Sequence, residues 1–330
     1  MGLVDAQPAA GRPLMQVSDL GVTFQTSRGS VRAVSGVSFE VRESEVFALV
    51  GESGCGKSTT ALAVMRLVPP PGRIDSGQVV FDGVPLLDLD EDAMARVRGK
   101  QISMIFQNPL VALNPVYRSA AQIEEALLLD QIPRDRAWKL AVGVMGDVKI
   151  PDAPERALSY PHELSGGMRQ RVMTGMMISR SPRLLIADEP TTALDVTIQA
   201  QVLELLMDIR RRTKMSIMII THDFGIVAET ADRIAVMYAG GIVEQGGVLE
   251  VFEQSGHPYT RLLMRALPRL TKEEGRLETI AGHVPNLVEL PSGCTFHPRC
   301  PLKRDACLIE RPTVREVSPG HFVTCHYPEV

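Results

Sequence analysis

Residues 51–58 read GESGCGKS and directly follow an apolar run, Val46–Val50. This spacing matches a phosphate-binding loop, which requires a strand before it and a helix after it. Its glycines let backbone N–H groups surround phosphate oxygens, and the N-terminus of the following helix adds the positive end of its dipole. Five consecutive apolar residues are typical of a strand that is buried on both faces. The motif therefore predicts an α/β fold around a largely parallel sheet.

Two side chains of this loop carry the chemistry that phosphates need. Lys57 supplies a positive charge to the β- and γ-phosphates, and Ser58 offers a hydroxyl to Mg²⁺. A glycine-rich turn with an incidental lysine is the alternative, but the strand and helix in the required places favour a nucleotide site. Cys55 occupies a variable position and is interpreted as filler. The residues of the loop predicted to surround the nucleotide are Gly51, Ser53, Gly54, Cys55, Gly56, Lys57, Ser58 and Thr59.

Further strands and helices follow from the apolar periodicity. A half-buried strand is expected at 37–41, and buried strands at 184–187, 217–220 and 234–237. Apolar residues at Val202, Leu205, Leu206 and Ile209 follow the i, i+3, i+4, i+7 rule of a helix. Residues from about 108 to 160 contain helical stretches at 120–129 and 136–145 without a convincing strand, which indicates an inserted helical subdomain.

Composition excludes several classes of protein. The chain has 330 residues, of which 45% are hydrophobic and 22% charged, and its net charge is −4. A dedicated nucleic-acid binder would normally show a basic surplus. No apolar run reaches the roughly 18 residues of a membrane-spanning helix, and residues 1–13 do not have the pattern of a secretory signal. We therefore expect a cytosolic protein, and any link to a membrane must come through a partner.

A second motif adds hydrolytic chemistry. Residues 184–189 read LLIADE, an apolar strand that ends in two carboxylates. Asp188 is placed to hold Mg²⁺, and Glu189 is placed to polarise the water that attacks the γ-phosphate. A solvated strand end is the alternative interpretation, which the sequence beside it disfavours.

Residues 164–171 read LSGGMRQR, and this segment resembles the signature motif of ATP-binding-cassette (ABC) proteins, usually LSGGQ. Ser165, Gly166 and Gly167 ahead of a helical stretch make a second phosphate-binding corner. In the family that the resemblance implies, two cassettes pair head to tail and each signature closes on the ATP of the other cassette. Met168 departs from the usual glutamine, but the serine and the glycines remain, so activity is expected.

The resemblance implies roles for four further residues. Gln107, after the strand expected at 102–106, resembles the glutamine that contacts Mg²⁺ and water and senses the permease. Asp195, in Ala193–Asp195, resembles the loop that crosses to the partner cassette, and His222 resembles the histidine that reaches the γ-phosphate. Phe24 is the candidate for stacking on adenine, although an isolated strand Phe is as often a core residue.

The resemblance extends from about residue 14 to residue 328 and is strongest to importers of dipeptides and oligopeptides. Residues 160–171, residues 188–201 (DEPTTALDVTIQAQ), and HPYT at 257–260 with ALP at 266–268 support this branch. The implied architecture is a RecA-like core, an antiparallel β subdomain and an inserted helical subdomain. The expected divisions are a loose leader at 1–13, a nucleotide-binding domain at 14–255 with its insert at about 108–165, and a C-terminal module at 256–330.

The same resemblance implies an assembly and a cargo. The expected partners are a second, distinct ABC ATPase subunit, two transmembrane permease subunits and an extracytoplasmic solute-binding protein, at the cytoplasmic face of the plasma (inner) membrane. Relatives in this branch also carry nickel or glutathione, so these cargoes remain alternatives. A soluble ABC ATPase of DNA repair or translation is a weaker alternative, because basic patches, coiled-coil insertions and CxxC knuckles are not visible. An iron–sulfur electron carrier is weaker still, because the hydrolytic set is complete.

Four cysteines lie close together in the sequence near the C-terminal end, with the spacing C-x₅-C-x₆-C-x₁₇-C. In a reducing cytosol such a group indicates a metal or cofactor site in preference to disulfides. Four thiolates are the usual complement of an iron–sulfur cluster, and the resemblance favours [4Fe–4S] in a structural role. Zinc is the main alternative, with His297, His321 or His326 as substitute ligands. The predicted ligands are Cys294, Cys300, Cys307 and Cys325.

Overall fold

The computed structural model describes residues 11–27, 29–107, 112–191, 195–266 and 280–329. The chain divides into two compact units, of which the larger contains residues 1–88 and 220–330 and the smaller contains residues 89–219. The first ten residues of the expected leader lie outside the described residues, and the first strand begins at Pro13. Among the described residues, no helix has both the length and the apolar character needed to cross a membrane.

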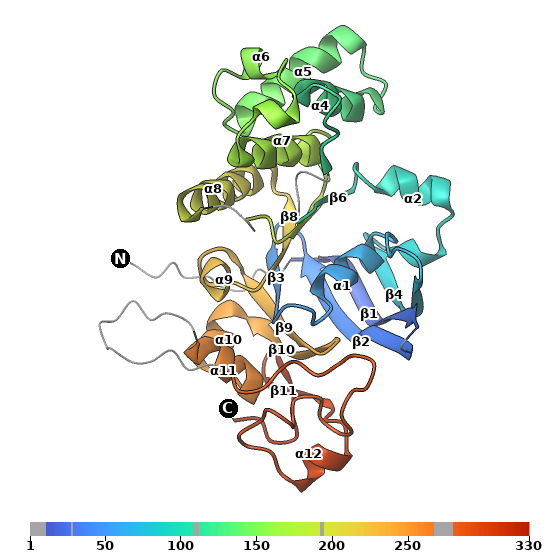
Figure 1. Cartoon of the computed structure of the whole chain (residues 1–330), viewed down its shortest axis with the longest axis vertical. Helices are drawn as coiled ribbons and strands as arrows, with labels where there is room; N and C mark the ends of the chain where they lie inside the picture. Colours follow the sequence, from blue (N-terminus) through green and yellow to red (C-terminus); the bar gives the residue numbers. More distant parts are fainter. Residues whose placement is uncertain (1–10, 28, 108–111, 192–194, 267–279, 330) are drawn as a thin grey trace, which may run out of the picture. The chain divides into compact units, whose positions relative to one another are not determined.

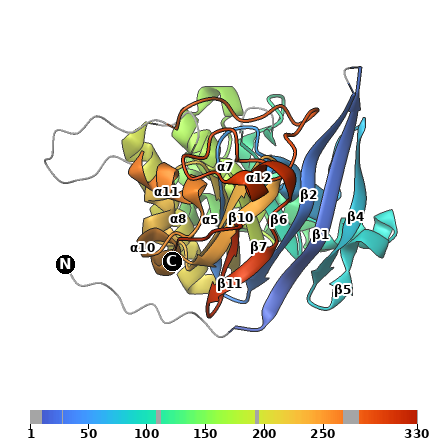
Figure 2. The same ribbon diagram turned by 90° about the horizontal axis from the view of Figure 1, so that it is seen from below.

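An antiparallel sheet forms one part of the larger unit. Its strand order is β2-β1-β4-β5, and β1 and β2 run side by side with Val17 opposite Phe39 and Phe24 opposite Val31 (Figure 2). The strand expected at 37–41 lies within β2, and its alternating side chains Val37, Phe39 and Val41 are buried as predicted. The strands are β1 (Pro13–Thr26), β2 (Gly29–Arg42), β4 (Gly72–Phe81) and β5 (Val84–Pro85).

A second sheet in the larger unit contains β3 and four strands from the C-terminal half. Their order is β11-β12-β10-β9-β3, in which β3 and β9 are parallel and the other neighbours are antiparallel. The sheet is therefore mixed, because the tight turn after Tyr238 joins β9 to β10 as a hairpin. The strands are β3 (Val46–Val50), β9 (Arg233–Tyr238), β10 (Gly241–Gly247), β11 (Val314–Ser318) and β12 (His321–Thr324).

The helices of the larger unit are short. In Figure 1, α9, α10 and α11 lie beside this second sheet, whereas α1 lies over the antiparallel sheet and contacts β1 and β2. One apolar cluster unites β3, β9, α9, α10 and α11 with Phe296 of the C-terminal region. The rings of Tyr238, Tyr259 and Phe296 pack with centroids 4.6–5.3 Å apart. Tyr259 and Phe296, both in the expected C-terminal module, therefore share a core with the strands before them. The helices are α1 (Lys57–Val64), η1 (Leu86–Asp88), α9 (Phe224–Thr230), α10 (Val248–Glu253), α11 (Pro258–Arg265) and α12 (Asp305–Ile309).

The smaller unit contains the parallel strands β6 and β7, with Ile102 opposite Leu184, and most of the long helices. The helices expected at 120–129 and 136–145 are confirmed as α4 and α5, whereas residues 108–111 of the expected insert lie outside the described residues. The elements are α2 (Glu91–Val97), β6 (Ile102–Ile105), α4 (Ser119–Leu128), α5 (Arg134–Asp147), α6 (Ala153–Arg156), η2 (Pro161–Glu163), α7 (Gly166–Ile178), β7 (Leu184–Asp188), α8 (Val196–Thr213) and β8 (Ser216–Thr221). The boundary between the two units falls within β8.

Helix α8 shows how the sequence determines an element of this unit. Asp195 caps its N-terminus by accepting a hydrogen bond from the N–H of Ile198 at 3.0 Å, and Lys214 ends it in the left-handed conformation. The predicted apolar face, Val202, Leu205, Leu206 and Ile209, is at most 3% exposed. The helix is therefore stabilised mainly by burial of this face.

Candidate nucleotide site

The loop after β3 has the predicted form of a phosphate-binding loop. Helix α1 begins at Lys57, and the preceding Gly56 adopts the left-handed conformation with φ of 109°. The Lys57 ammonium is 5% exposed and donates hydrogen bonds to the carbonyls of Gly51 at 2.8 Å and Glu52 at 3.0 Å. The loop thus curls around Lys57, and its carbonyls hold the ammonium where phosphate oxygens can take their place.

Cys55 lies on the inner side of this loop and is completely buried. Burial raises the pKa of its thiol, and the ammonium of Lys57 approaches the sulfur at 3.8 Å. A neutral buried thiol acts as a small apolar side chain, which agrees with its interpretation as filler.

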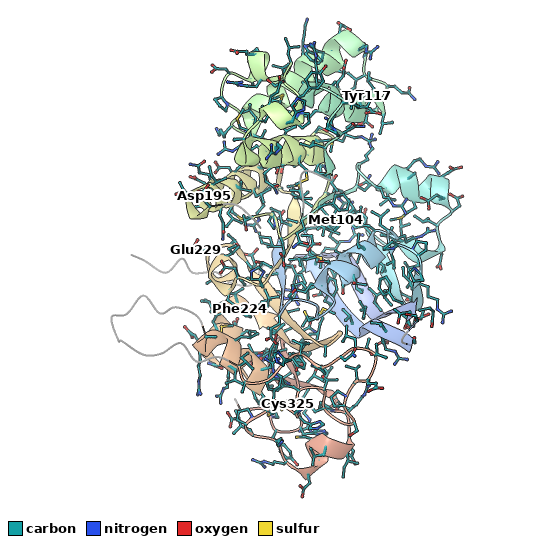
Figure 3. All side chains as sticks on the ribbon, viewed as in Figure 1. Met104, Tyr117, Asp195, Phe224, Glu229 and Cys325 are labelled. Atoms are coloured by element: carbon teal, nitrogen blue, oxygen red, sulfur yellow. The ribbon has the colours of Figure 1, made fainter. Side chains whose placement is uncertain are left out.

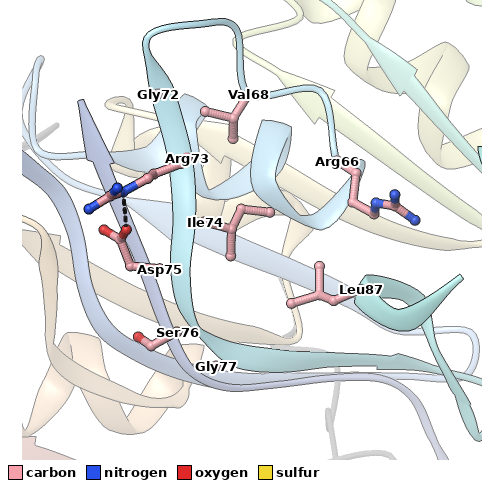
Figure 4. A pocket seen from close by; sticks show the side chains of 9 residues that line it. All are labelled: Arg66, Val68, Gly72, Arg73, Ile74, Asp75, Ser76, Gly77 and Leu87. Atoms are coloured by element: carbon pink, nitrogen blue, oxygen red, sulfur yellow. Dashed lines mark hydrogen bonds and ion pairs between the residues drawn. The ribbon is translucent and has the colours of Figure 1, made fainter. Parts of the chain in front are cut away.

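Phe24 lies on β1 opposite Gly72 of β4 and is half-buried. A Cβ atom on Gly72 would come within 2.5 Å of the Phe24 ring, so the ring packs directly on that glycine. Gly72 lines a pocket along β4 in which Arg73 and Asp75 form an ion pair at 2.6 Å (Figure 4). Ring stacking on adenine therefore stays a prediction, and this pocket contains none of the predicted phosphate ligands.

The end of β7 brings two predicted residues together in the smaller unit. Asp188 is 5% exposed, and Glu189 follows it with φ of 45°. The Gln107 side-chain amide donates a hydrogen bond to the Glu189 carboxylate at 2.8 Å. The amide nitrogen thus orients the carboxylate that we predict to polarise water, and 82 residues of chain separate the two.

The signature segment forms the start of α7. Ser165 caps this helix, and its hydroxyl accepts a hydrogen bond from the N–H of Met168 at 3.3 Å. Gly167 packs on α8 so closely that a Cβ atom there would lie 2.9 Å from Cγ2 of Ile198. The serine and the two glycines are thus explained locally by a helix cap and a close helix contact, and their role toward a partner nucleotide stays a prediction.

Gln170 is a structural residue that the sequence analysis missed. Its side chain is 2% exposed, and its amide donates a hydrogen bond to the carbonyl of Pro190 at 2.7 Å. This bond ties the signature helix to the segment that follows Glu189. The sequence shows only that a polar residue stands at this position of the signature segment. Its burial is visible in the structure, and buried polar groups normally have a hydrogen-bond partner.

Two further predicted residues have different surroundings. Asp195 is exposed and caps α8, as described above and labelled in Figure 3. Residues 193 and 194 of its loop lie outside the described residues. His222 is exposed immediately after β8, where a polar side chain ends a buried strand.

The four cysteines of the C-terminal region line one small cavity in the larger unit. A hydrogen bond from the N–H of Cys294 to the carbonyl of Cys307, 2.9 Å long, holds two of their segments together. Burial, with smaller contributions from the charges of the other three cysteines, raises the pKa of Cys294 to about 11. Burial also raises the pKa values of Cys300 and Cys325.

Side chains around this cavity do not form a site for a single metal ion in the part of the chain that the structure describes. A zinc ion bound at about 2.3 Å by four sulfurs requires those sulfurs to lie about 3.8 Å apart. The chemistry of the donor set nevertheless suits a soft metal, because four thiols line one cavity and thiolates are the ligands that soft metals prefer. The structure thus gathers the predicted ligands around one cavity.

Comparisons with known protein families divide the chain as the motifs do. Residues 34–192 match the family described as ABC transporter. Residues 243–307 match the family described as Oligopeptide/dipeptide transporter, C-terminal region.

Curated relatives match along almost the whole chain. A probable peptide ABC transporter ATP-binding protein of Sinorhizobium fredii is 47% identical, and the match covers 94% of each chain. The oligopeptide transport ATP-binding protein OppD of Salmonella typhimurium is 46% identical over 97% of this chain and 96% of its own. The dipeptide transport ATP-binding protein DppD of Escherichia coli is 43% identical over 96% of this chain and 97% of its own.

Solved structures share the cassette fold. A dimeric ATP-binding cassette in a post-hydrolysis state, bound to ADP and Pi, has a TM-score of 0.64 at 24% identity over 71% of this chain and 98% of its own. A component of a cbiONQ transporter from Clostridium perfringens has a TM-score of 0.63 at 26% identity over 73% of this chain and 91% of its own.

Proposed function

Because the chain belongs to the family of ABC transporter ATP-binding proteins that carry the oligopeptide/dipeptide C-terminal region, we propose that it hydrolyses ATP to power the import of peptides. The observation that carries this proposal is that one chain matches both the ABC transporter family and the oligopeptide/dipeptide C-terminal region. The names of its relatives support a peptide cargo in preference to nickel or glutathione.

The roles of the site residues follow from their chemistry. Lys57 and the N–H groups of residues 51–59 bind the phosphates, and Ser58, Gln107 and Asp188 would hold Mg²⁺, which neutralises phosphate charge when bound. Glu189, oriented by Gln107, polarises the attacking water, and His222 contacts the γ-phosphate. Ser165, Gly166 and Gly167 act on the nucleotide of a second cassette, and Asp195 belongs to the loop that crosses to that cassette.

Glu189→Gln tests the hydrolytic assignment. The amide is nearly isosteric but cannot accept a proton, so we expect ATP binding to persist while the hydrolysis rate falls by about 10²- to 10⁴-fold. Lys57→Ala should instead weaken binding, because it deletes the charge that faces the phosphates. The measurements are the affinity for MgATP and the rate of phosphate release by the complete transporter. If the Glu189→Gln transporter hydrolysed ATP at the wild-type rate, Glu189 would not be the residue that polarises the attacking water.

The proposed assembly contains two permease subunits, a second and distinct ATP-binding subunit, and an extracytoplasmic solute-binding protein. The chain would bind the permeases at the cytoplasmic face of the inner membrane. Isolation of the native complex and identification of its chains tests this composition. Copurification with DNA in place of polytopic proteins would support a repair ATPase instead.

A [4Fe–4S] cluster is our proposal for the cavity lined by four cysteines. The support for this proposal is that four thiols, the usual ligands of such a cluster, line one cavity. A structural role is favoured over a redox role, because ATP hydrolysis transfers no electrons. Zinc on the same residues is the competing occupant.

Metal analysis of anaerobically purified protein distinguishes the two occupants. We expect about four irons and four sulfides per chain with broad absorption near ~400 nm, and we expect Cys325→Ser to lower both. Cys55→Ser is the matched control, because this cysteine is buried in the phosphate-binding loop and does not line the cavity. Colourless protein with stoichiometric zinc would exclude the cluster.

A further inference from the structure

Glu52, the second residue of the phosphate-binding loop, has each of its three polar groups held by another residue. Its carbonyl accepts a hydrogen bond from Lys57 at 3.0 Å. Its backbone N–H donates to the hydroxyl of Tyr259 at 3.1 Å. Its carboxylate accepts two hydrogen bonds from the guanidinium of Arg299, at 2.7 and 3.1 Å. Two of the three partners thus come from the C-terminal region, 207 and 247 residues away.

Arg299 is placed for this contact by the segment that carries the cysteines. Its backbone N–H donates to the carbonyl of Phe296 at 3.0 Å, in the turn between Cys294 and Cys300. Its side chain is 4% exposed, donates to the carbonyl of Ala281 at 3.0 Å, and lies 5.8 Å from the centroid of the Tyr238 ring. A two-pronged pair of this kind, made by a buried guanidinium, fixes both the orientation and the charge of the carboxylate.

Tyr259, which accepts the hydrogen bond from the Glu52 N–H, is also held in place by its surroundings. The side chain is completely buried, and its ring packs on Tyr238 and Phe296. Burial and the nearby charge of Glu52 raise the pKa of its hydroxyl, which stays protonated. The hydroxyl oxygen therefore remains a neutral acceptor for the N–H of the phosphate-binding loop.

The charge of Glu52 gives these contacts a consequence for nucleotide binding. Its carboxylate belongs to a loop that receives polyanionic phosphates, and it is 28% exposed. Without Arg299, the Glu52 carboxylate would carry an unpaired negative charge and could rotate toward the phosphates, which it would repel. With Arg299, the charge is neutralised and the side chain is held in one position.

We infer that Arg299 and Tyr259 are positioning residues of the phosphate-binding loop, which lock Glu52 and so make the affinity for ATP depend on the C-terminal region. This inference rests on the proposed ATPase function. The C-terminal region would thus act directly on the nucleotide site, in addition to carrying the cysteine cavity.

The test measures the affinity of the full-length chain for MgATP in the Glu189→Gln background, which prevents turnover. Arg299→Met is expected to raise the Kd about three- to tenfold, because it frees the Glu52 charge. Glu52→Gln removes that charge and is expected to bind up to about twofold more tightly. The double variant Glu52→Gln/Arg299→Met is expected to bind close to the starting protein, so that the second change rescues the first.

Arg304→Met is the matched control, because it removes the same charge from the same region. The Arg304 guanidinium lies 4.3 Å from the centroid of the Tyr327 ring, and among the described residues it makes no hydrogen bond or ion pair with the phosphate-binding loop. Its Kd should be unchanged. Arg299→Lys, which keeps the charge, should retain most of the affinity and provides a measurable variant if Arg299→Met does not fold.

Rescue separates a positioning role from a merely structural one. If Arg299→Met and the double variant lost affinity equally, or if Arg299→Met bound as tightly as the control, the inference would be wrong. If the starting protein did not bind MgATP at all, the proposed function would fail instead.

Discussion

His257 is a neutral side chain inside the larger unit, and its burial makes stability depend on pH. The ring is 1% exposed, and its Nδ1 accepts a hydrogen bond from the N–H of Tyr259 at 3.1 Å. Burial lowers the pKa of His257 to about 4, although the charge of Glu244 opposes this shift. Because unfolded histidine has a pKa of about 6.5, the unfolded state takes up the proton first as pH falls. The contribution of neutral His257 to the free energy of unfolding is therefore complete above about pH 6.5 and is lost as the pH falls toward 4.

The expected loss from this one residue is about 2 kcal/mol between pH 7 and pH 5. Urea unfolding at both pH values measures it, with His257→Asn as the comparison, because asparagine can still cap α11 but does not titrate. The difference between wild type and variant isolates the histidine from the carboxylates that titrate in both proteins. Equal pH dependence in the two proteins would contradict the prediction.

At the scale of elements, the contact between α7 and α8 depends on the absence of a side chain at Gly167. A Cβ atom there would lie 2.9 Å from Cγ2 of Ile198, a branched position that cannot swing away without moving the α8 backbone. We expect Gly167→Ala to lower the free energy of unfolding by about 1–2 kcal/mol, measured by urea or thermal unfolding.

Gly143→Ala is the matched control for this substitution. Gly143 lies within α5, and a Cβ atom there would meet no atom within 4 Å. The alanine should stabilise the protein by up to about 1 kcal/mol, because it improves helix propensity without a clash. A Gly167→Ala protein as stable as Gly143→Ala would show that α8 accommodates the methyl group without strain.

At the scale of the whole molecule, coupling to a permease requires an exposed surface that the hydrolytic residues do not use. Val116 and Tyr117, between Gln107 and α4, are 71% and 56% exposed. Tyr117 is labelled in Figure 3. Apolar side chains with this exposure are typical of contact surfaces when they occur together. We expect Tyr117→Glu to reduce peptide import severalfold while the affinity of the chain for MgATP stays unchanged.

Leu129→Glu provides the comparison for this surface. Leu129 is 69% exposed at the opposite end of α4, so the substitution adds the same charge to the same unit. Its import activity should remain near that of the wild type. Transport by reconstituted complexes and nucleotide binding by the isolated chain are the two measurements. Equal loss of import in both variants would place the permease contact elsewhere, and loss of nucleotide affinity would indicate misfolding.

The sequence by itself determined the local features of this protein. The run Val46–Val50 became β3 with the predicted bounds, and the glycine-rich loop was followed by α1. The strands around 184–187, 217–220 and 234–237 and the apolar face of α8 were also confirmed. These features depend on side-chain period, glycine spacing and helix caps, which act over a few residues and are therefore readable in the chain.

Only the tertiary structure decided which distant segments meet. It paired β12 with β10, gathered the four cysteines around one cavity, and placed Arg299 on Glu52. Neither Glu52 nor Arg299 has a periodicity or a motif that assigns it a partner, and 247 residues separate them. Such contacts arise because the rings of Tyr238, Tyr259 and Phe296 bury together, which fixes the C-terminal region against β9 and brings its buried charge to the loop. Charge pairing over that distance depends on packing and register, which local sequence patterns do not encode.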